Sequence, residues 1–164
     1  MEGFKQRYLT HFTRYPQQTT RSPHPQTFVT VVIPCLNEPA IIQTLASLWK
    51  GDRPLWPAEI LVVLNHASDA PDEVKAYNAE TFKAIEKWAA NHSDANFRVL
   101  PLWFGDIKPK LAGVGTARKL GMDEAVYRFY QISQPEGIIA CLDADCEVAP
   151  NYLPALEQHF RKHP

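Results

Sequence analysis

Two aspartates near the carboxyl end of the sequence have the spacing of a cation site. Asp143 and Asp145 follow the apolar run GIIACL. In an extended segment, side chains at i and i+2 point to the same side about 6.5 to 7 Å apart, so two such carboxylates repel unless a cation joins them. Hard oxygen ligands suit Mg²⁺ or Mn²⁺, which binds through one or two carboxylates together with phosphate oxygens. We therefore expect a divalent metal at Asp143 and Asp145; a turn followed by a helix cap is the alternative.

A second group of residues has the chemistry to bind an anion. Four basic residues bracket the segment AGVGTA, namely Lys108, Lys110, Arg118 and Lys119. This segment lies at the start of an expected helix, where backbone amides and the helix dipole favour an anion such as a diphosphate. A solvated basic surface is the alternative. GVGTAR does not indicate a dinucleotide site, because it lacks the third glycine and follows a Lys/Pro loop instead of a strand.

These groups are placed by alternating strands and helices. We expect strands at residues 28–33, 59–64, 97–103 and 137–142. We expect helices at residues 39–49, from Pro71 onward, at 111–130 and from Pro150, the last interrupted by Pro154. Pro34 is expected to end pairing of the first strand. This order predicts an α/β fold: a Rossmann-like, mostly parallel sheet with helices on both faces and ligands at the carboxyl ends of the strands.

Apolar residues at helical spacing predict which helix faces pack on the sheet. In the second helix they are Val74, Tyr77, Thr81, Ile85 and Trp88, and in the third Met122, Val126, Phe129 and Tyr130. The polar residues gather instead after the strands. They are Asn37 and Glu38 after the first, Asn65, His66, Ser68 and Asp69 after the second, and Asp143 and Asp145 after the fourth.

The first residues differ in pattern from the rest. Phe4, Tyr8, Phe12 and Tyr15 share one side of a predicted helix that Pro16 ends. Residues 16–27 contain three prolines and almost no apolar side chain, which is typical of an extended linker. We therefore divide the chain into an N-terminal helix and linker at 1–27 and one domain at 28–164. Packing on that domain is the expected role of the helix; docking to a partner or a peripheral membrane contact is the alternative.

Composition excludes several classes of protein. A chain of 164 residues is one domain's worth, and 45% hydrophobic with 21% charged residues is typical of a folded globular protein. A net charge of -1 argues against a nucleic-acid partner. The sequence has neither a membrane-span-length apolar run nor a signal core, so we expect a cytoplasmic protein. Three cysteines, an odd number, are expected to be reduced thiols.

Four motifs, in this order, resemble a known enzyme family. They are VVIPCLNE, EILVVLNHASD, KLAGVGTARKLG and IIACLDADCEVAPNYL. Together they resemble the nucleotide-sugar-binding part of family 2 glycosyltransferases of the GT-A fold, over roughly residues 27–156. The resemblance implies transfer of a sugar from a nucleoside diphosphate to an unidentified acceptor (a glycan, a lipid or a protein), with Asp143 and Asp145 as the D-x-D that holds Mn²⁺ or Mg²⁺. The residues expected to bind the donor are Pro34, Cys35, Asn37, Glu38, Asn65, Lys110, Arg118 and Asp143.

The sequence departs from the family's pattern in two places. The family usually ends its second strand in V-D-D-G-S, with an aspartate on the base, whereas Asn65 stands at that position. An amide both donates and accepts hydrogen bonds, so the base preference stays open. The family's catalytic base lies beyond the D-x-D, and neither Glu157, His159 nor His163 has the context of that base. We therefore expect the chain to be part of a longer enzyme.

Other interpretations use some of the same residues. A non-catalytic module that binds a nucleotide or a partner is the main alternative. Cys141, Cys146, His159 and His163 have the spacing of a Cys₂His₂ zinc module. His66 and Asp69 form a candidate acid/base pair. A haloacid-type phosphatase places its D-x-D after the first strand and continues to a threonine, whereas here the motif follows the fourth strand and continues to Cys146.

Overall fold

The structure is a computed structural model that describes residues 2–163, with side chains described from Arg7 onward. Its elements in chain order are α1 (Glu2–His11), β1 (Val29–Cys35), α2 (Ile41–Lys50), β2 (Ala58–Ala67), α3 (Asp72–Asn91), β3 (Phe97–Ile107), a 3₁₀ turn (Pro109–Leu111), α4 (Val114–Gln131), β4 (Ile138–Cys141) and α5 (Tyr152–Lys162). No helix among the described residues is long and apolar enough to cross a membrane.

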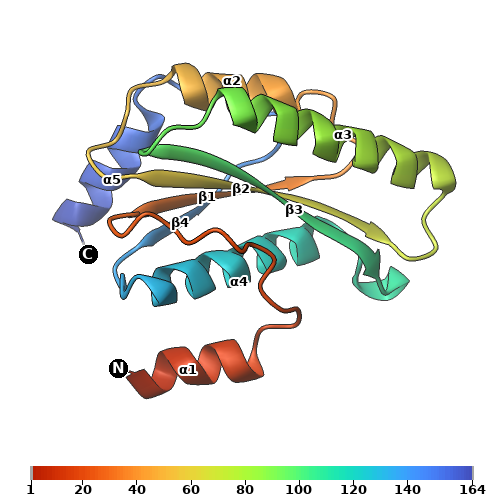
Figure 1. Ribbon diagram of the computed structural model, residues 1–164, viewed down its shortest axis with the longest axis horizontal. Helices are drawn as coiled ribbons and strands as arrows, with labels where there is room; N and C mark the ends of the chain where they lie inside the picture. Colours follow the sequence, from red (N-terminus) through yellow and green to blue (C-terminus); the bar gives the residue numbers. More distant parts are fainter. Residues whose placement is uncertain (1, 164) are drawn as a thin grey trace.

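The described strands form one parallel sheet in the order β3-β2-β1-β4. Helices α2 and α3 cover one face, α4 covers the other, and α1 lies beyond α4 (Figure 1). The expectation of a Rossmann-like α/β sheet with helices on both faces is therefore confirmed.

Alternate residues of the strands enter two separate apolar layers. Val31 and Ile33 of β1 pack with α2, α3 and α5, whereas Val32 packs with the side of the sheet that α4 covers. Helix α4 approaches this side closely at Gly121, where an added Cβ would collide with Val32 and Val63. All these strand residues are buried on both faces of the sheet, which is why the strands appear in the sequence as unbroken apolar runs.

Two expectations about prolines at the ends of elements are wrong. Pro34 lies inside β1, and pairing continues to Cys35 opposite Leu64. The Leu142 amide donates to the Val32 carbonyl, so the even-numbered residues of β1 direct their backbone amides and carbonyls toward β4. Strand β4 ends at Cys141 and does not extend as far as Pro34. The missing amide of Pro34 therefore costs no ladder bond, because no strand lies beside it. Pro154 does not interrupt α5, because it lies in the first turn, where helix amides have no partner within the helix.

Strands β2 and β3 are longer than predicted. They pair as far as Ala67 opposite Ile107, so Asn65 and His66 lie within β2 instead of after it. Beyond their apolar runs the two strands remain extended because they continue to pair with each other.

The predicted apolar faces of α3 and α4 are only partly correct. In α3, Thr81 and Ile85 are buried as expected, but Tyr77 is exposed and Asn78 is buried in its place. In α4, Phe129 is buried but Tyr130 is exposed. Helix α4 lies between the sheet and the N-terminal segment, so both of its sides are covered and no single stripe describes it.

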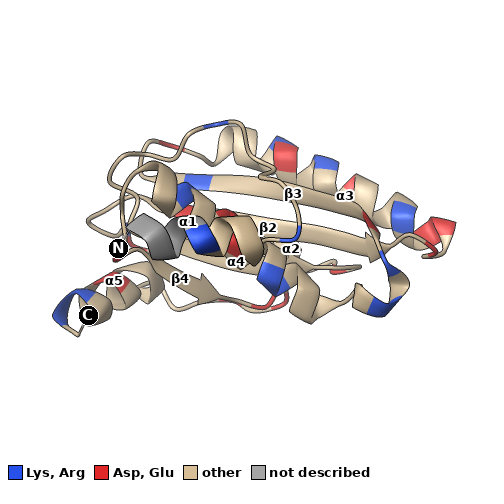
Figure 2. Cartoon of the chain, turned by 90° about the horizontal axis from the view of Figure 1, so that it is seen from below, with Lys and Arg blue, Asp and Glu red and all other residues tan. Residues whose placement is uncertain are grey.

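The N-terminal helix is shorter than predicted, ending at His11 rather than at Pro16. The side chain of Phe4 lies outside the described side chains. Tyr8 and Phe12 stack on each other, whereas Tyr15 meets the edge of Phe104 in β3. Viewed from below, α1 lies against α4, with charged residues of both signs where the two helices meet (Figure 2).

Residues 16–27 form no helix or strand, yet hydrogen bonds attach them to the domain. Arg128 and Glu59 form a salt bridge, each side chain only 1% exposed. The Arg128 guanidinium also donates to Thr19 Oγ1 at 2.5 Å and to the Arg21 carbonyl at 2.9 Å. Glu124 accepts the backbone amides of Gln18 and Thr19. The segment is therefore an anchored strap, a feature that its polar composition did not indicate.

Candidate functional site

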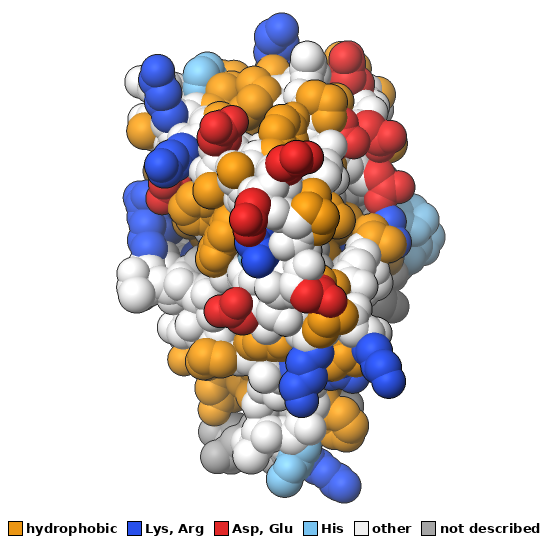
Figure 3. Space-filling model, turned by 90° about the vertical axis from the view of Figure 1, so that its right-hand side faces the viewer, with side chains coloured by type: hydrophobic (Ala, Val, Ile, Leu, Met, Phe, Trp, Pro, Cys, Tyr) orange, Lys and Arg blue, Asp and Glu red, His pale blue; other side chains and the backbone are white. Residues whose placement is uncertain are grey.

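The carboxyl ends of the strands meet at one edge of the sheet, the right-hand side of Figure 1. The space-filling view of this edge shows several acidic side chains with Lys and Arg beside them (Figure 3). Most of the residues that the sequence singled out lie on segments of this edge, and four hydrogen-bonded contacts connect those segments.

The first contact joins the D-x-D motif to α4. Arg118, in the first turns of α4, forms an ion pair with Asp143. The two side chains are 35% and 57% exposed, so the pair contributes little to stability, about 0 to 1 kcal/mol. Its importance is positional: the predicted anion-binding segment and the predicted metal ligands lie side by side.

The second contact determines the shape of the D-x-D segment. The Cys146 amide donates to the Asp143 carbonyl at 3.2 Å, which makes residues 143–146 a turn. Ala144 points into the core, and its carbonyl accepts the Thr44 hydroxyl at 2.7 Å. The expected extended geometry is therefore wrong, although Asp143 and Asp145 are both exposed. Burial of Ala144 directs its two neighbours outward.

The third contact involves Asn65, which is only 1% exposed. Its Nδ2 donates to the Gly113 carbonyl at 3.3 Å. Gly113 precedes α4 with φ 148°, a backbone conformation that favours glycine. In this arrangement the Asn65 amide supports the loop that begins α4.

The fourth contact links the ends of β1 and β2 through Asn78, a completely buried residue of α3. Its Oδ1 accepts the Asn37 amide at 3.4 Å, and its Nδ2 donates to the Asn65 carbonyl at 3.3 Å. Asn37 has φ 51°, a left-handed conformation that asparagine tolerates. Sequence reasoning missed both Asn78 and Thr44. A polar residue on the apolar side of a helix was the only available signal.

The residues at the end of β1 differ in accessibility. Pro34 and Cys35 are buried, whereas Asn37 is exposed. The Glu38 carboxylate is half-buried and accepts the Ala40 amide at 3.0 Å, just before α2. Burial, followed by the nearby Glu38 charge, raises the pKa of the Cys35 thiol to about 12. Cys35 is therefore a neutral thiol at ordinary pH and not a nucleophile.

The basic residues near α4 do not all lie at this edge. Lys108 precedes the 3₁₀ turn and Lys110 lies within it, and both are exposed. Lys119 points away toward the N-terminal segment, where its ammonium donates to the Phe12 carbonyl, and it forms an ion pair with Asp123 of α4. The first turn of α4 has no side-chain cap, and no atom outside the adjacent residues and the helix's own backbone lies within 4 Å of the Cβ position at Gly115. An anion can therefore approach the free amides closely.

The donor atoms at this edge fit a hard divalent cation that is bound together with a ligand. Asp143 and Asp145 supply exposed carboxylate oxygens. Within residues 2–163, no three His, Cys, Asp or Glu side chains come together as a metal cluster. Water or phosphate oxygens would fill the remaining coordination positions, which is usual for Mg²⁺.

Two alternative sites do not form. Cys141, Cys146, His159 and His163 make no metal cluster in the described part of the chain, so the zinc interpretation is wrong. His66 is buried with its ring edge-on to Trp103, whereas Asp69 is exposed, so they do not form an acid/base pair.

Comparison with known proteins agrees with this architecture. The family model described as "Glycosyl transferase family 2" matches residues 30–164. The chain belongs to glycosyl transferase family 2. No curated protein matches the sequence. The crystal structure of residues 1–349 of S. aureus TarS is similar in fold, with a TM-score of 0.53 and 22% identity. The similarity covers 83% of this chain and 33% of the TarS chain, so this family 2 chain spans about a third of that structure. The GT-A type of fold expected from the motifs is thereby confirmed.

Proposed function

We propose that this chain is the donor-binding part of a glycosyltransferase that transfers sugar from a nucleoside diphosphate to a glycan, lipid or protein acceptor. The observation that carries the proposal is the contact between Arg118 and Asp143. In this family 2 chain, the contact supports the proposal because the start of α4, which suits a phosphate, lies beside the carboxylate of Asp143, which suits a divalent cation.

In this proposal, different residues of this edge bind the metal and the phosphates of the nucleoside diphosphate. Asp143 and Asp145 would hold Mn²⁺ or Mg²⁺, while Arg118 and the free amides of α4 would donate hydrogen bonds to the phosphate oxygens. Lys110, exposed on the 3₁₀ turn before α4, adds a further positive charge. When bound, the metal would supply positive charge that offsets the negative charge developing on the departing nucleoside diphosphate.

The nucleoside lies at the end of β1 in this proposal. Asn37 and Glu38 face it, and the buried Pro34 and Cys35 form the base of the site. Asn65 contributes by holding Gly113, since its Nδ2 is already directed at that carbonyl.

Calorimetric titration tests the proposal. UDP, GDP, CDP and ADP are each titrated into the chain, first with Mn²⁺ and then with EDTA. We expect one or more of them to bind only with Mn²⁺, and Asp145→Asn to weaken that binding at least about tenfold. Glu147→Gln is the matched control, because it removes an exposed carboxylate two residues further along the chain.

The outcomes separate binding from transfer. Failure of all four nucleotides in both conditions overturns the proposal. Metal-dependent binding without hydrolysis or transfer of the corresponding nucleotide sugar favours the non-catalytic module instead.

A further inference from the structure

We propose that helix α2 controls divalent-metal binding by holding in place the loop that carries Asp143 and Asp145. Thr44 and Ser47 of α2 are the positioning residues. The loop, residues 143–150, lies between β4 and α5, and we call it the metal loop. This inference rests on the proposed function, because it takes the two aspartates to be the metal ligands. Neither Thr44 nor Ser47 belongs to the motifs that pointed to the site.

The first contact holds the backbone between the two aspartates. The Thr44 hydroxyl donates to the Ala144 carbonyl at 2.7 Å, and both residues are buried. Asp143 and Asp145, on either side of Ala144, are exposed. Thr44 therefore does not face the metal itself, and it acts on the ligands through the residue that connects them.

The second contact lies one helical turn further along α2. The Ser47 hydroxyl donates to the Thr44 carbonyl at 2.8 Å and accepts the Val148 amide at 3.2 Å. Because its proton is used within α2, its oxygen is left to accept the loop amide. Residues 44 and 47 are three apart, so they lie on the same side of the helix.

The end of the metal loop lies against the end of α2. The Asp52 amide donates to the Pro150 carbonyl at 2.8 Å. Gly51 lies so close to the loop that a Cβ added there would be 2.8 Å from the same carbonyl oxygen. The metal loop therefore contacts α2 and the residues just after it at three positions, 144, 148 and 150.

The burial of the first contact connects it to metal binding. Without the Thr44 hydroxyl, the buried Ala144 carbonyl loses this donor, which is unfavourable. Loop conformations that expose the carbonyl to water then become more populated, and they move the two neighbouring aspartates. The apparent affinity for a metal falls with the population of the binding conformation.

Amide hydrogen exchange measured by NMR tests the contacts without any ligand. Thr44→Val keeps the shape of the side chain but removes the hydroxyl, whereas Thr44→Ser retains the hydroxyl. The reporters are the Cys146 amide, which donates to the Asp143 carbonyl, and the Val148 amide. We expect both to exchange at least about fivefold faster in Thr44→Val and within about twofold of the wild type in Thr44→Ser. Ser47→Ala should accelerate the Val148 amide in the same way.

Titration with Mn²⁺ alone tests the consequence for binding. Mn²⁺ broadens the NMR signals of nearby amides, so broadening at residues 143–147 gives an apparent Kd for this site. We expect Thr44→Val to raise that Kd at least about fivefold, and Thr44→Ser to leave it within about twofold of the wild type. Urea unfolding at the same temperature shows that each variant is folded during the titration.

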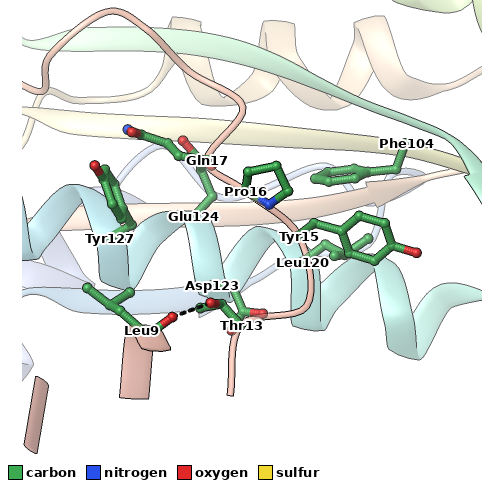
Figure 4. Close-up of a pocket in the computed structure, with 10 residues that line it drawn as sticks. All are labelled: Leu9, Thr13, Tyr15, Pro16, Gln17, Phe104, Leu120, Asp123, Glu124 and Tyr127. Atoms are coloured by element: carbon green, nitrogen blue, oxygen red, sulfur yellow. Dashed lines mark hydrogen bonds between the residues drawn. The ribbon is translucent and has the colours of Figure 1, made fainter. Parts of the chain in front are cut away.

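Two further threonine variants are the matched controls. Thr30→Val removes an equally buried hydroxyl in β1, which has no hydrogen-bond partner among the described residues. Thr13→Val removes a hydroxyl that donates to the Leu9 carbonyl in the N-terminal segment (Figure 4). Both variants should leave the exchange of the metal loop and the Kd for Mn²⁺ unchanged.

The outcomes distinguish this inference from the proposed function. If the wild type binds Mn²⁺ at residues 143–147 and Thr44→Val binds it equally well, the role of α2 is overturned and the metal site stands. If the wild type shows no broadening there, the metal site of the proposed function is overturned, and this inference with it. Equal losses of affinity in Thr44→Val and Thr44→Ser would overturn the role of the hydroxyl and assign the effect to packing.

Discussion

Replacing Arg128 with methionine tests how the N-terminal strap is held against the domain. The substitution keeps most of the side-chain volume but removes a guanidinium that makes two 2.7 Å bonds to Glu59. It also removes the bonds to Thr19 and to the Arg21 carbonyl. The Glu59 carboxylate, 1% exposed, would keep only Arg98 at 4.0 Å.

The expected loss follows from this uncompensated charge. Removing one partner of a buried ion pair costs about 3 to 5 kcal/mol, which lowers the midpoint of thermal unfolding by roughly 6 to 20 °C in a chain of this size. Urea unfolding followed by circular dichroism measures the free energy directly. Arg14→Met, at an exposed position, is the matched control and should change it by less than about 0.5 kcal/mol.

The double variant Arg128→Met with Glu59→Leu separates charge from packing. Because no buried carboxylate remains, it should recover at least half of the lost free energy of unfolding. A loss below about 1 kcal/mol in the single variant would refute the reasoning. A double variant as unstable as the single would assign the loss to packing and strap contacts instead.

Two further predictions concern stability. Gly121→Ala should lower the free energy of unfolding by about 1 to 3 kcal/mol, because its Cβ would overlap Val32 and Val63. Gly115→Ala, with open space around its Cβ position, should be neutral or stabilising by up to about 1 kcal/mol in the same urea assay; equal effects would contradict the close approach of α4 to the sheet. The raised pKa of Cys35, about 12, keeps its thiol protonated in the folded chain while the unfolded chain loses the proton near pH 9. Stability should therefore fall as the pH rises from about 9 to 12, by up to about 1.4 kcal/mol per pH unit for this group, and the fall should be smaller in Cys35→Ala, in which the raised pKa values of Cys141 and Tyr152 still contribute. Identical pH profiles for the two proteins would show that burial of Cys35 has no such effect.

The sequence predicted best those parts of the fold in which nearly every residue is apolar and buried. The two central strands, β1 and β2, are buried on both faces, so apolar runs such as the one that ends at Leu64 indicate strands. The ends of elements were less predictable. Pro34 remains in β1 only because β4 stops before reaching it, and nothing within β1 itself encodes the length of β4.

The candidate site shows the same division. Asp143 and Arg118 were each predicted from their own motif, and their contact became visible only in the folded chain. Thr44 and Asn78, which hold the loops, were missed because their partners are backbone atoms far away in the sequence.

By itself, the sequence determined the alternation of strands and helices, the family and the residues with the chemistry to hold a metal and a diphosphate. These properties depend on local composition and on motifs that are continuous along the chain. Only the tertiary structure decided that Asp143 lies in a turn, that Lys119 faces away from the site, and that Arg128 anchors residues 16–27. The physical reason is that burial and pairing of a charge depend on groups distant in sequence, whose positions exist only once the sheet and helices have packed.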